Sequence, residues 1–218
     1  MISSSRLSSI QRFKQDLAKL KKSNGTDAWV RCIAACLAQA AGPTTAINVI
    51  FYYSTTMCQM LGFKDQEADY LSIGLYACNA FGTLLSLIFI NRLPRVPTLQ
   101  YSILGMALIH IGLFASQLAQ SYRPECTALG MIAVSLIFGF VFIFSLLFAG
   151  VQLVYTSEVV SPQARSASIG IATASGWLWN FVIAFVSAYI LPMMGSFIFL
   201  LFAQLCCLVF ILFCFMPR

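Results

Sequence analysis

The sequence predicts an all-α membrane protein with six transmembrane helices. The 218 residues are 60% apolar and only 9% charged, whereas a soluble domain carries about 25% charged residues. The charges gather in short segments that separate long charge-free windows, and a spanning helix needs about 20 such residues. These windows are continuous and rich in Leu, Ile and Phe, so we expect helices and not the short alternating strands of a barrel.

Four charge-free windows give one span each, and a fifth, from Ser166 to Pro217, is long enough for two. Pro and Gly end helices, so the segment LPMMG is expected to divide the fifth window. We therefore predict a basic amphipathic segment over residues 1–28, followed by a six-helix bundle over residues 29–218. The predicted helices cover residues 30–60, 69–90, 97–120, 127–156, 168–190 and 195–215.

The distribution of charge predicts the topology. An even number of spans puts both termini on one side, and eleven of the 13 basic residues then fall on that side. They are Arg6, Arg12, Lys14, Lys19, Lys21, Lys22, Arg31, Arg92, Arg95, Arg165 and Arg218. The positive-inside rule puts both termini in the cytosol. We expect a multi-pass protein of the plasma membrane or of an organelle, with the plasma membrane favoured. The net charge of +6 thus reflects topology, and no nucleic-acid partner is expected.

The N-terminal segment 5–22 has apolar residues at helical spacing among basic ones. We favour a cytosolic helix that lies on the bilayer or on the protein, attracted by anionic lipid. A mitochondrial presequence and a calmodulin-type target remain alternatives.

No catalytic or metal-binding set is apparent, so we expect neither an enzyme nor a cofactor. The eight cysteines lie mostly within predicted helices, where Cys behaves as a small apolar residue, and there is no CxxC pair. His110 lies in the middle of a predicted helix. It is interpreted either as a packed, hydrogen-bonded side chain or, less favoured, as part of a proton relay.

Polar residues follow a predicted kink in the first span. Gly42 and Pro43 interrupt the helix there, since proline removes a backbone donor. Asn48 and Tyr52 follow, and with Thr45 they share one helix face. A broken helix with a polar stripe is typical of transporter sites at the bilayer midplane. Helix–helix contact through Thr and Asn is the alternative, equally weighted for Asn48.

Three further polar or aromatic residues lie inside later spans. Asn79 is in the middle of the second span, on a helix with small residues. Trp177 and Asn180 are three apart in the fifth span and so share a face. An indole beside an amide suits a sugar, whose CH faces stack and whose hydroxyls bond to amides. The alternative for Trp177 is a place in the aromatic belt at the membrane–water interface. Trp179 is expected to face lipid or to pack against another helix.

Charges at the cytosolic end of the fourth span predict an ion pair. Glu158 ends that span, and Arg165 follows across a Ser-Pro turn. Glu158 is expected to pair with Arg92 or Arg95 of the loop between the second and third spans. An exposed pair of this kind contributes only about 0–1 kcal/mol. Between moving bundles it would act as a latch, and a solvated charge pair is the alternative.

The segments AINVIFYYSTT, NRLPRVP, YTSEVVSPQAR and ATASGWLWNFVIAF together resemble the sugar porter family of the major facilitator superfamily, especially its fungal hexose transporters. That family has twelve helices in two halves. This chain is similar to the central linker followed by helices seven to twelve. The resemblance implies one half-bundle of a major facilitator fold. It also implies alternating-access transport of a hexose-like monosaccharide across a lipid bilayer, together with an N-terminal half or by self-association.

The resemblance also implies roles for individual residues. The residues it implies for sugar binding are Asn48, Asn79, Trp177 and Asn180. The residues it implies for gating are Tyr52 and Tyr53 on the extracellular side, and Arg92, Arg95, Glu158 and Arg165 in the cytosolic latch.

The chain departs from the family pattern at several positions. Gly42 and Pro43 stand where the family has a glutamine pair, and Gly176 replaces an asparagine. The cytosolic motif has lost its acid at Asn91, and Gly150 and Leu153 replace the family's Pro-x-x-Trp. These departures motivate a second hypothesis, a truncated or degenerate membrane protein that does not transport, such as a sensor or regulatory subunit.

Overall fold

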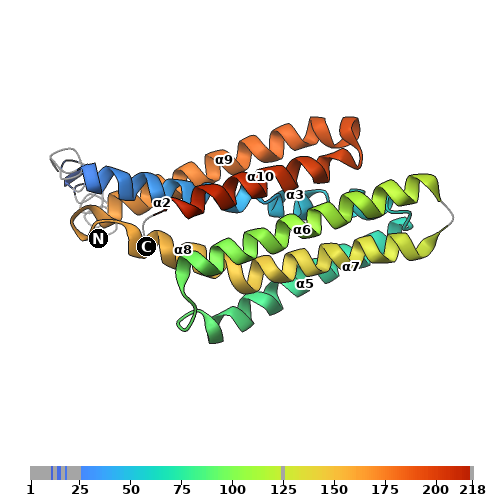
Figure 1. Cartoon of the computed structure of the whole chain (residues 1–218), viewed down its shortest axis with the longest axis horizontal. Coiled ribbons are helices and arrows are strands. Elements are labelled where there is room, and N and C mark those ends of the chain that lie inside the picture. Colours follow the sequence, from blue (N-terminus) through green and yellow to red (C-terminus); the bar gives the residue numbers. More distant parts are fainter. Residues whose placement is uncertain (1–10, 12–13, 16–17, 19–25, 124–125, 217–218) are drawn as a thin grey trace, which may run out of the picture.

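The structure is a computed structural model that describes residues 11, 14–15, 18, 26–123 and 126–216. These residues are all-helical, and six helices are long and apolar enough to cross a membrane (Figure 1). The six spans are Ala28–Tyr52, Asp65–Phe89, Arg95–Tyr122, Thr127–Val159, Arg165–Met194 and Phe197–Cys214. The predicted fold class is therefore confirmed. Most of the predicted amphipathic segment over residues 1–28 lies outside the described residues.

Two of the six spans, the first and the fourth, are built from more than one helical element. In chain order the elements are α2 (Thr26–Thr44), α3 (Ile47–Tyr52), α4 (Ser54–Met60), α5 (Asp65–Phe89), α6 (Arg95–Tyr122), α7 (Thr127–Ile143), the π-helix η1 (Phe144–Ala149), α8 (Gly150–Val159), the 3₁₀-helix η2 (Pro162–Ala164), α9 (Arg165–Met194) and α10 (Phe197–Cys214).

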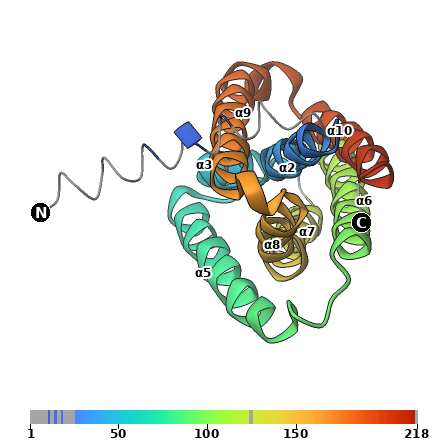
Figure 2. The same ribbon diagram turned by 90° about the vertical axis from the view of Figure 1, so that its left-hand side faces the viewer.

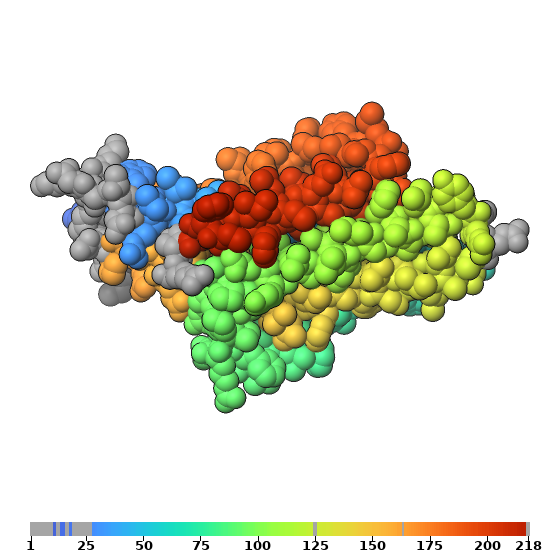
Figure 3. All heavy atoms as spheres, in the orientation of Figure 1, coloured from blue at the N-terminus to red at the C-terminus, as the bar shows by residue number. Residues whose placement is uncertain are grey.

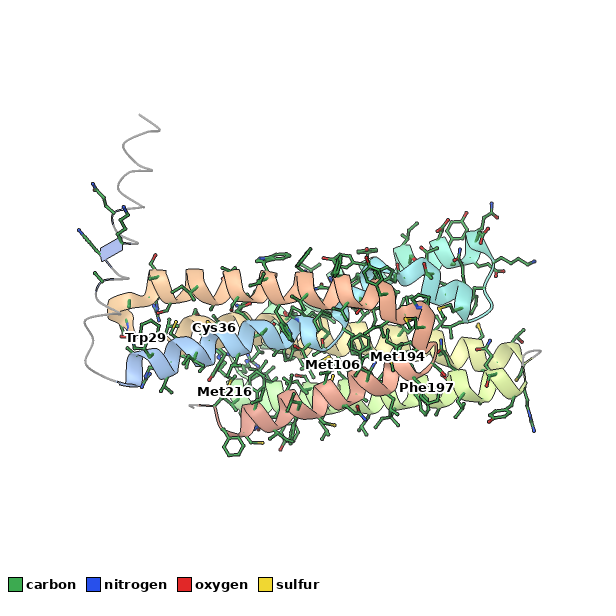
Figure 4. The ribbon with its side chains drawn as sticks, turned by 90° about the horizontal axis from the view of Figure 1, so that it is seen from above. Trp29, Cys36, Met106, Met194, Phe197 and Met216 are labelled. Carbon is green, nitrogen blue, oxygen red and sulfur yellow. The ribbon has the colours of Figure 1, made fainter. Side chains whose placement is uncertain are left out.

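Local sequence explains where helices begin and end. The backbone N–H of Lys64 donates to Glu67 Oε2 at 3.0 Å, and acidic residues in the first turn of α5 favour its positive end. α9 continues through Pro192 and ends at Met194, and the φ of +53° at the following Gly195 suits glycine. Figure 4 shows Met194 and Phe197 beside the turn that follows, far from Trp29 near the start of α2.

The bundle is organised around α2. In the view along the bundle, α2 is enclosed by the other spans and α5 lies at the periphery (Figure 2). Each span has an apolar stretch that could cross the membrane. In the first span 67% of this stretch is buried inside the bundle, whereas only 22% is buried in the second span and 17% in the fifth. α2 packs along α9, and α10 lies along α6 on the face shown in Figure 3. The outer faces of α5 and α9 are thus apolar and uncovered.

The first span is broken where the sequence predicts a kink, but in a different form. The prediction was one helix over residues 30–60 that bends at Gly42–Pro43. In the structure α2 runs to Thr44, and the break follows at Ala46, whose φ is +69°. Proline has no N–H and its ring conflicts with the carbonyl four residues earlier, so the helix is weakened around it. A second interruption at Tyr53 separates α3 from α4.

The fourth span contains a π-helix, which the sequence analysis did not predict. η1 lies between α7 and α8 and packs closely against α5. A Cβ built on Gly82 would stand 2.0 Å from Ser145 Oγ, and one on Gly150 would stand 2.9 Å from Ile90 Cδ1. Small residues are what allow membrane helices to approach this closely.

The basic loops and the acidic start of α5 lie at opposite ends of the bundle. The start of α2 and the end of α10 lie at the same end of the molecule (Figure 1). The loop that carries Arg92 and the turn before Arg165 lie at this end too, whereas α5 begins with its acidic residues at the other. This is the loop arrangement from which the topology was predicted.

Candidate functional site

A cavity of about 240 Å³ lies between the broken first span, the fourth span and the fifth span. Its walls combine amide, hydroxyl and indole groups with apolar side chains. The lining residues are Gln39, Gly42, Pro43, Ile47, Asn48, Phe144, Gln152, Leu153, Thr173, Gly176, Trp177 and Asn180. None of these lining residues has a titratable side chain, so the cavity is polar but uncharged.

Two asparagines from different spans meet at the cavity. Asn48 Nδ2 donates to Asn180 Oδ1 at 2.6 Å, and Asn180 Nδ2 donates to the Tyr52 hydroxyl at 3.4 Å. α3 carries Asn48 and Tyr52, and α9 carries Asn180. This chain of hydrogen bonds links α3 to α9. It also leaves Asn48 Oδ1 without a partner among the described residues, so this oxygen is available to a ligand.

The two tryptophans of α9 have different surroundings. Trp177 lines the cavity, yet 68% of its surface is exposed. Trp179 Nε1 donates to Thr44 Oγ1 at 2.8 Å, which fixes that indole against α2. Trp177 is therefore the indole that a ligand in the cavity would meet, and Trp179 serves packing.

Side chains from other spans donate to backbone carbonyls around the break in the first span. Gln152 Nε2 donates to Ala38 O at 2.7 Å and to Gln39 O at 3.2 Å. Gln39 O is the acceptor that an N–H at position 43 would have used, had it not been proline. At the break itself, His110 Nε2 lies 3.0 Å from Thr45 O and serves as its donor.

His110 is a hydrogen-bonded core residue in this structure. It is fully buried, and its ring packs against Phe140, Phe199 and Phe202 at centroid distances of 4.8–6.2 Å. Among the described residues, its other nitrogen, Nδ1, is the one fully buried side-chain nitrogen or oxygen without a hydrogen-bond partner. This arrangement agrees with the packed interpretation of His110.

Glycines make room for these contacts. A Cβ on Gly42 would stand 3.1 Å from Gln152 Oε1, and a Cβ on Gly176 would stand 3.1 Å from Gln39 Cβ. Gln39 Nε2 in turn donates to Thr156 Oγ1 at 3.2 Å. The two glycines therefore let amide side chains occupy space beside α2 that larger residues would fill.

Other residues predicted for the site lie apart from the cavity. Asn79 is half-buried on α5, away from the cavity lining, and its carbonyl accepts from Thr83 Oγ1. Tyr53 occupies the interruption between α3 and α4, where its hydroxyl lies 3.5 Å from Ala184 O of α9. Of the two predicted gating tyrosines, Tyr52 is the one joined to the asparagine pair.

The predicted ion pair at the basic end of the bundle forms with Arg95. Its guanidinium contacts Glu158 through two bonds, Nε to Oε2 at 3.1 Å and Nη2 to Oε1 at 3.2 Å. Nη1 donates to the carbonyls of Ile90 and Leu93. Arg95 therefore ties the turn between α5 and α6 to the end of α8.

The two other arginines of the predicted latch do not join this contact. Arg92 and Arg165 are both exposed, and among the described residues Glu158 pairs with Arg95 alone. Beside the pair is a second cavity of about 460 Å³, which Arg31, Tyr155 and the prolines at 94 and 97 help to line.

Replacing Arg95 is expected to cost more stability than replacing its partner. Glu158→Gln removes an ion pair whose side chains are 23% and 50% exposed, which is worth about 0–1 kcal/mol. Arg95→Ala also removes the donor to two loop carbonyls, so we expect a loss of about 1–2 kcal/mol. Thermal denaturation of the detergent-purified variants measures both. Arg95→Lys should not restore stability, since lysine lacks the planar guanidinium group that donates to several acceptors at once. Equal losses in Arg95→Ala and Glu158→Gln would contradict the role of the loop carbonyls.

Sequence reasoning missed Gln39 and Gln152. Both are amides within apolar helices, where an unpaired polar group is costly, and that cost is the signal that could have found them. Gln152 in particular is only 6% exposed and stands opposite the predicted Gly42–Pro43 kink.

Comparison with known proteins places the chain in a family. A family model described as "Sugar (and other) transporter" matches residues 2–217. The human facilitated glucose transporter member 4 of solute carrier family 2 is 30% identical over 173 residues, 79% of this chain and 33% of that protein. A low-affinity glucose transporter of Saccharomyces cerevisiae is 27% identical over 165 residues, 73% of this chain and 29% of that protein. The chain thus spans about a third of the length of these relatives.

Solved structures show the same fold. A major facilitator superfamily proton:xylose symporter bound to 6-bromo-6-deoxy-D-glucose matches with a TM-score of 0.70 and 20% identity, covering 98% of this chain and 46% of that one. A D-xylose-proton symporter matches with a TM-score of 0.71 and 19% identity, covering 100% of this chain and 48% of that one. Its fold is therefore that of the matched half of these symporters. By its sequence, the chain belongs to the sugar transporter family.

Proposed function

We propose that this chain takes part in the transport of a hexose-like sugar across the membrane by alternating access. It acts as the C-terminal half of a sugar porter, with helices seven to twelve, and works together with an N-terminal half or a second copy. Both termini lie in the cytosol, and the plasma membrane is its expected location, as the charge distribution favours.

The chemistry of the cavity carries this proposal. A neutral sugar offers hydroxyls and CH faces, and the cavity offers uncharged amides beside the indole of Trp177. Asn48 and Asn180 come from the broken first span and from α9, so a ligand held between them would bridge the two spans. The relatives whose names specify glucose support the substrate class.

The exposure of the cavity supports the need for a second bundle. Trp177 lines the cavity and is still largely exposed, so one wall is missing. α9, which carries Trp177, and α5 are also the two spans whose apolar stretches are least buried. Alternating access requires two bundles that rock around a shared site, and a second half would supply the missing wall.

Uptake of radiolabelled D-glucose tests the proposal. The protein at its native length is reconstituted in proteoliposomes, and initial rates are measured over a range of glucose concentrations. Trp177→Ala and Asn48→Ala are each expected to raise KM by roughly 5- to 10-fold, since one contact or hydrogen bond is worth about 1 kcal/mol. Leu178→Ala is the matched control, because Leu178 is 67% exposed on the same helix and lies outside the cavity lining. Unchanged uptake in both site variants would refute the proposed site.

A second candidate function is a membrane protein that does not transport. The observation that favours it is that the amides of Asn48 and Asn180 already satisfy each other in part, opposite a Gly42–Pro43 pair that offers no side-chain amide. The size of the native protein on an immunoblot is the first discriminating measurement. A band near twice 24.0 kDa favours a complete transporter. A band at 24.0 kDa favours either a half-transporter that needs a partner or a protein that does not transport, and measurement of saturable uptake separates these two.

A further inference from the structure

The amide of Gln152 is held rigidly at the wall of the cavity. Gln152 lies on α8, three residues after η1 ends, and is 6% exposed. Its Nε2 donates to two successive carbonyls of α2, those of Ala38 at 2.7 Å and Gln39 at 3.2 Å. Two hydrogen bonds to the same backbone segment leave the amide plane little freedom to rotate.

These two bonds also fix which end of the amide faces the cavity. Carbonyl oxygens accept and do not donate, so the NH₂ group must point at α2 and a flipped amide would set oxygen against oxygen. The oxygen, Oε1, has no hydrogen-bond partner among the described residues. Oε1 is also not fully buried. Among the described residues, the one fully buried side-chain nitrogen or oxygen without a hydrogen-bond partner is His110 Nδ1. Oε1 is therefore an oriented acceptor at the surface of the cavity.

We propose that Gln152 Oε1 accepts a hydrogen bond from one hydroxyl of the transported sugar and so helps to determine which sugar is chosen. The inference rests on the proposed transport function and adds a residue to its site. A fixed, unpaired acceptor rejects analogues that lack the matching hydroxyl, since the acceptor loses its hydration and gains nothing in return. Asn48 and Trp177 line the same cavity and contact the remainder of the ligand.

The space that the amide occupies depends on Gly42. A Cβ at position 42 would stand 3.1 Å from Gln152 Oε1 and 3.2 Å from Nε2, closer than ordinary contact. A longer side chain at 42 and the Gln152 amide therefore compete for one place. It follows that an amide introduced at position 42 can replace the Gln152 amide only when Gln152 is shortened.

The experiment measures how well each monodeoxy analogue of D-glucose inhibits radiolabelled glucose uptake by the native-length protein in proteoliposomes. One analogue is expected to inhibit about 3- to 10-fold more weakly than glucose in the unsubstituted protein, as the loss of one hydrogen bond predicts. In Gln152→Ala that difference should disappear. In the double variant Gly42→Gln/Gln152→Ala it should return in part, whereas Gly42→Gln alone should impair uptake.

Gln100→Ala is the matched control. Gln100 is a glutamine of α6 whose Nε2 also donates to a backbone carbonyl, that of Phe213 at 3.3 Å, but it lies outside the cavity lining. Its variant should keep the discrimination between analogues. If Gln152→Ala does not remain monodisperse, Gln152→Met preserves the length of the side chain without the acceptor and serves for the same comparison.

The outcomes separate this inference from the proposed function. Saturable uptake with undiminished discrimination in the Gln152 variants overturns the role of Gln152 alone. Absence of saturable uptake by the unsubstituted protein overturns both. Loss of discrimination in Gln152→Ala, kept in Gln100→Ala and regained in the double variant, supports the acceptor and is not expected if Gln152 only braces α2.

Discussion

His110→Ala is expected to lower the stability of the bundle more than any other single truncation considered above. The side chain is fully buried against three phenylalanines, and its removal leaves a cavity where an aromatic-sized group was. Truncations of this kind cost about 3–5 kcal/mol. The variant also leaves Thr45 O, at the break in the first span, without its donor. We expect the denaturation midpoint in detergent to fall by about 6–20 °C.

His110→Phe separates packing from hydrogen bonding. This variant leaves Thr45 O unpaired, which costs about 1–3 kcal/mol, but it also removes the orphaned Nδ1, whose burial costs about as much. The two effects offset each other, so the midpoint should change little. Size-exclusion profiles after heating give the midpoints, and glucose uptake is measured in parallel. Normal stability with abolished uptake would instead favour the proton-relay interpretation of His110.

Gly82→Leu is expected to separate α5 from the fourth span. Even a Cβ at this position would stand 2.0 Å from Ser145 Oγ and 3.0 Å from Ser145 Cβ. Ser145 is fully buried and its hydroxyl donates to Val141 O at 2.8 Å, so it has little room to yield. Overpacking of this kind costs about 1–3 kcal/mol or more. The expected result is a lower denaturation midpoint and a larger fraction of aggregated protein in detergent.

A reciprocal pair of variants checks the cause of this effect. Gly82→Ala gains about 1 kcal/mol of helix propensity, yet the contact with Ser145 should still make it destabilising. Gly82→Ala/Ser145→Gly exchanges the small residue between the two helices and should recover most of the lost stability. A midpoint in the double variant no higher than in Gly82→Ala would show that the close contact is not the cause.

The sequence was sufficient for the six spans because hydrophobic length and charge placement act locally. The break in the first span was also foreseeable from Pro43, since the missing donor is a property of the residue itself. Its form was not, because Ala46 adopts a left-handed conformation that only the surrounding contacts stabilise. The π-helix was missed for the same reason: Phe144–Ala149 has no composition that distinguishes it from a regular helix.

The candidate site could be predicted only in part. Asn48, Trp177 and Asn180 stand out because polar and indole groups are unusual within apolar windows, and all three line the cavity. Gln152 was missed because its role depends on a neighbour 110 residues away in sequence at Gly42, and such a pairing is set by packing. The choice of Arg95 over Arg92 as the partner of Glu158 likewise depends on loop geometry.

The π-helix η1 sets the rotation of one half of the fourth span relative to the other. A π-helix of this kind carries one residue more than a regular helix needs, and one residue corresponds to a turn of about 100° around the axis. Ser145, near the start of η1, contacts α5, and Gln152, beyond the end of η1, lines the cavity. Deleting a single residue within η1 would make the span a regular helix. It would also rotate Gln152 by about a quarter turn away from the cavity, and other side chains of α8 would line the cavity in its place.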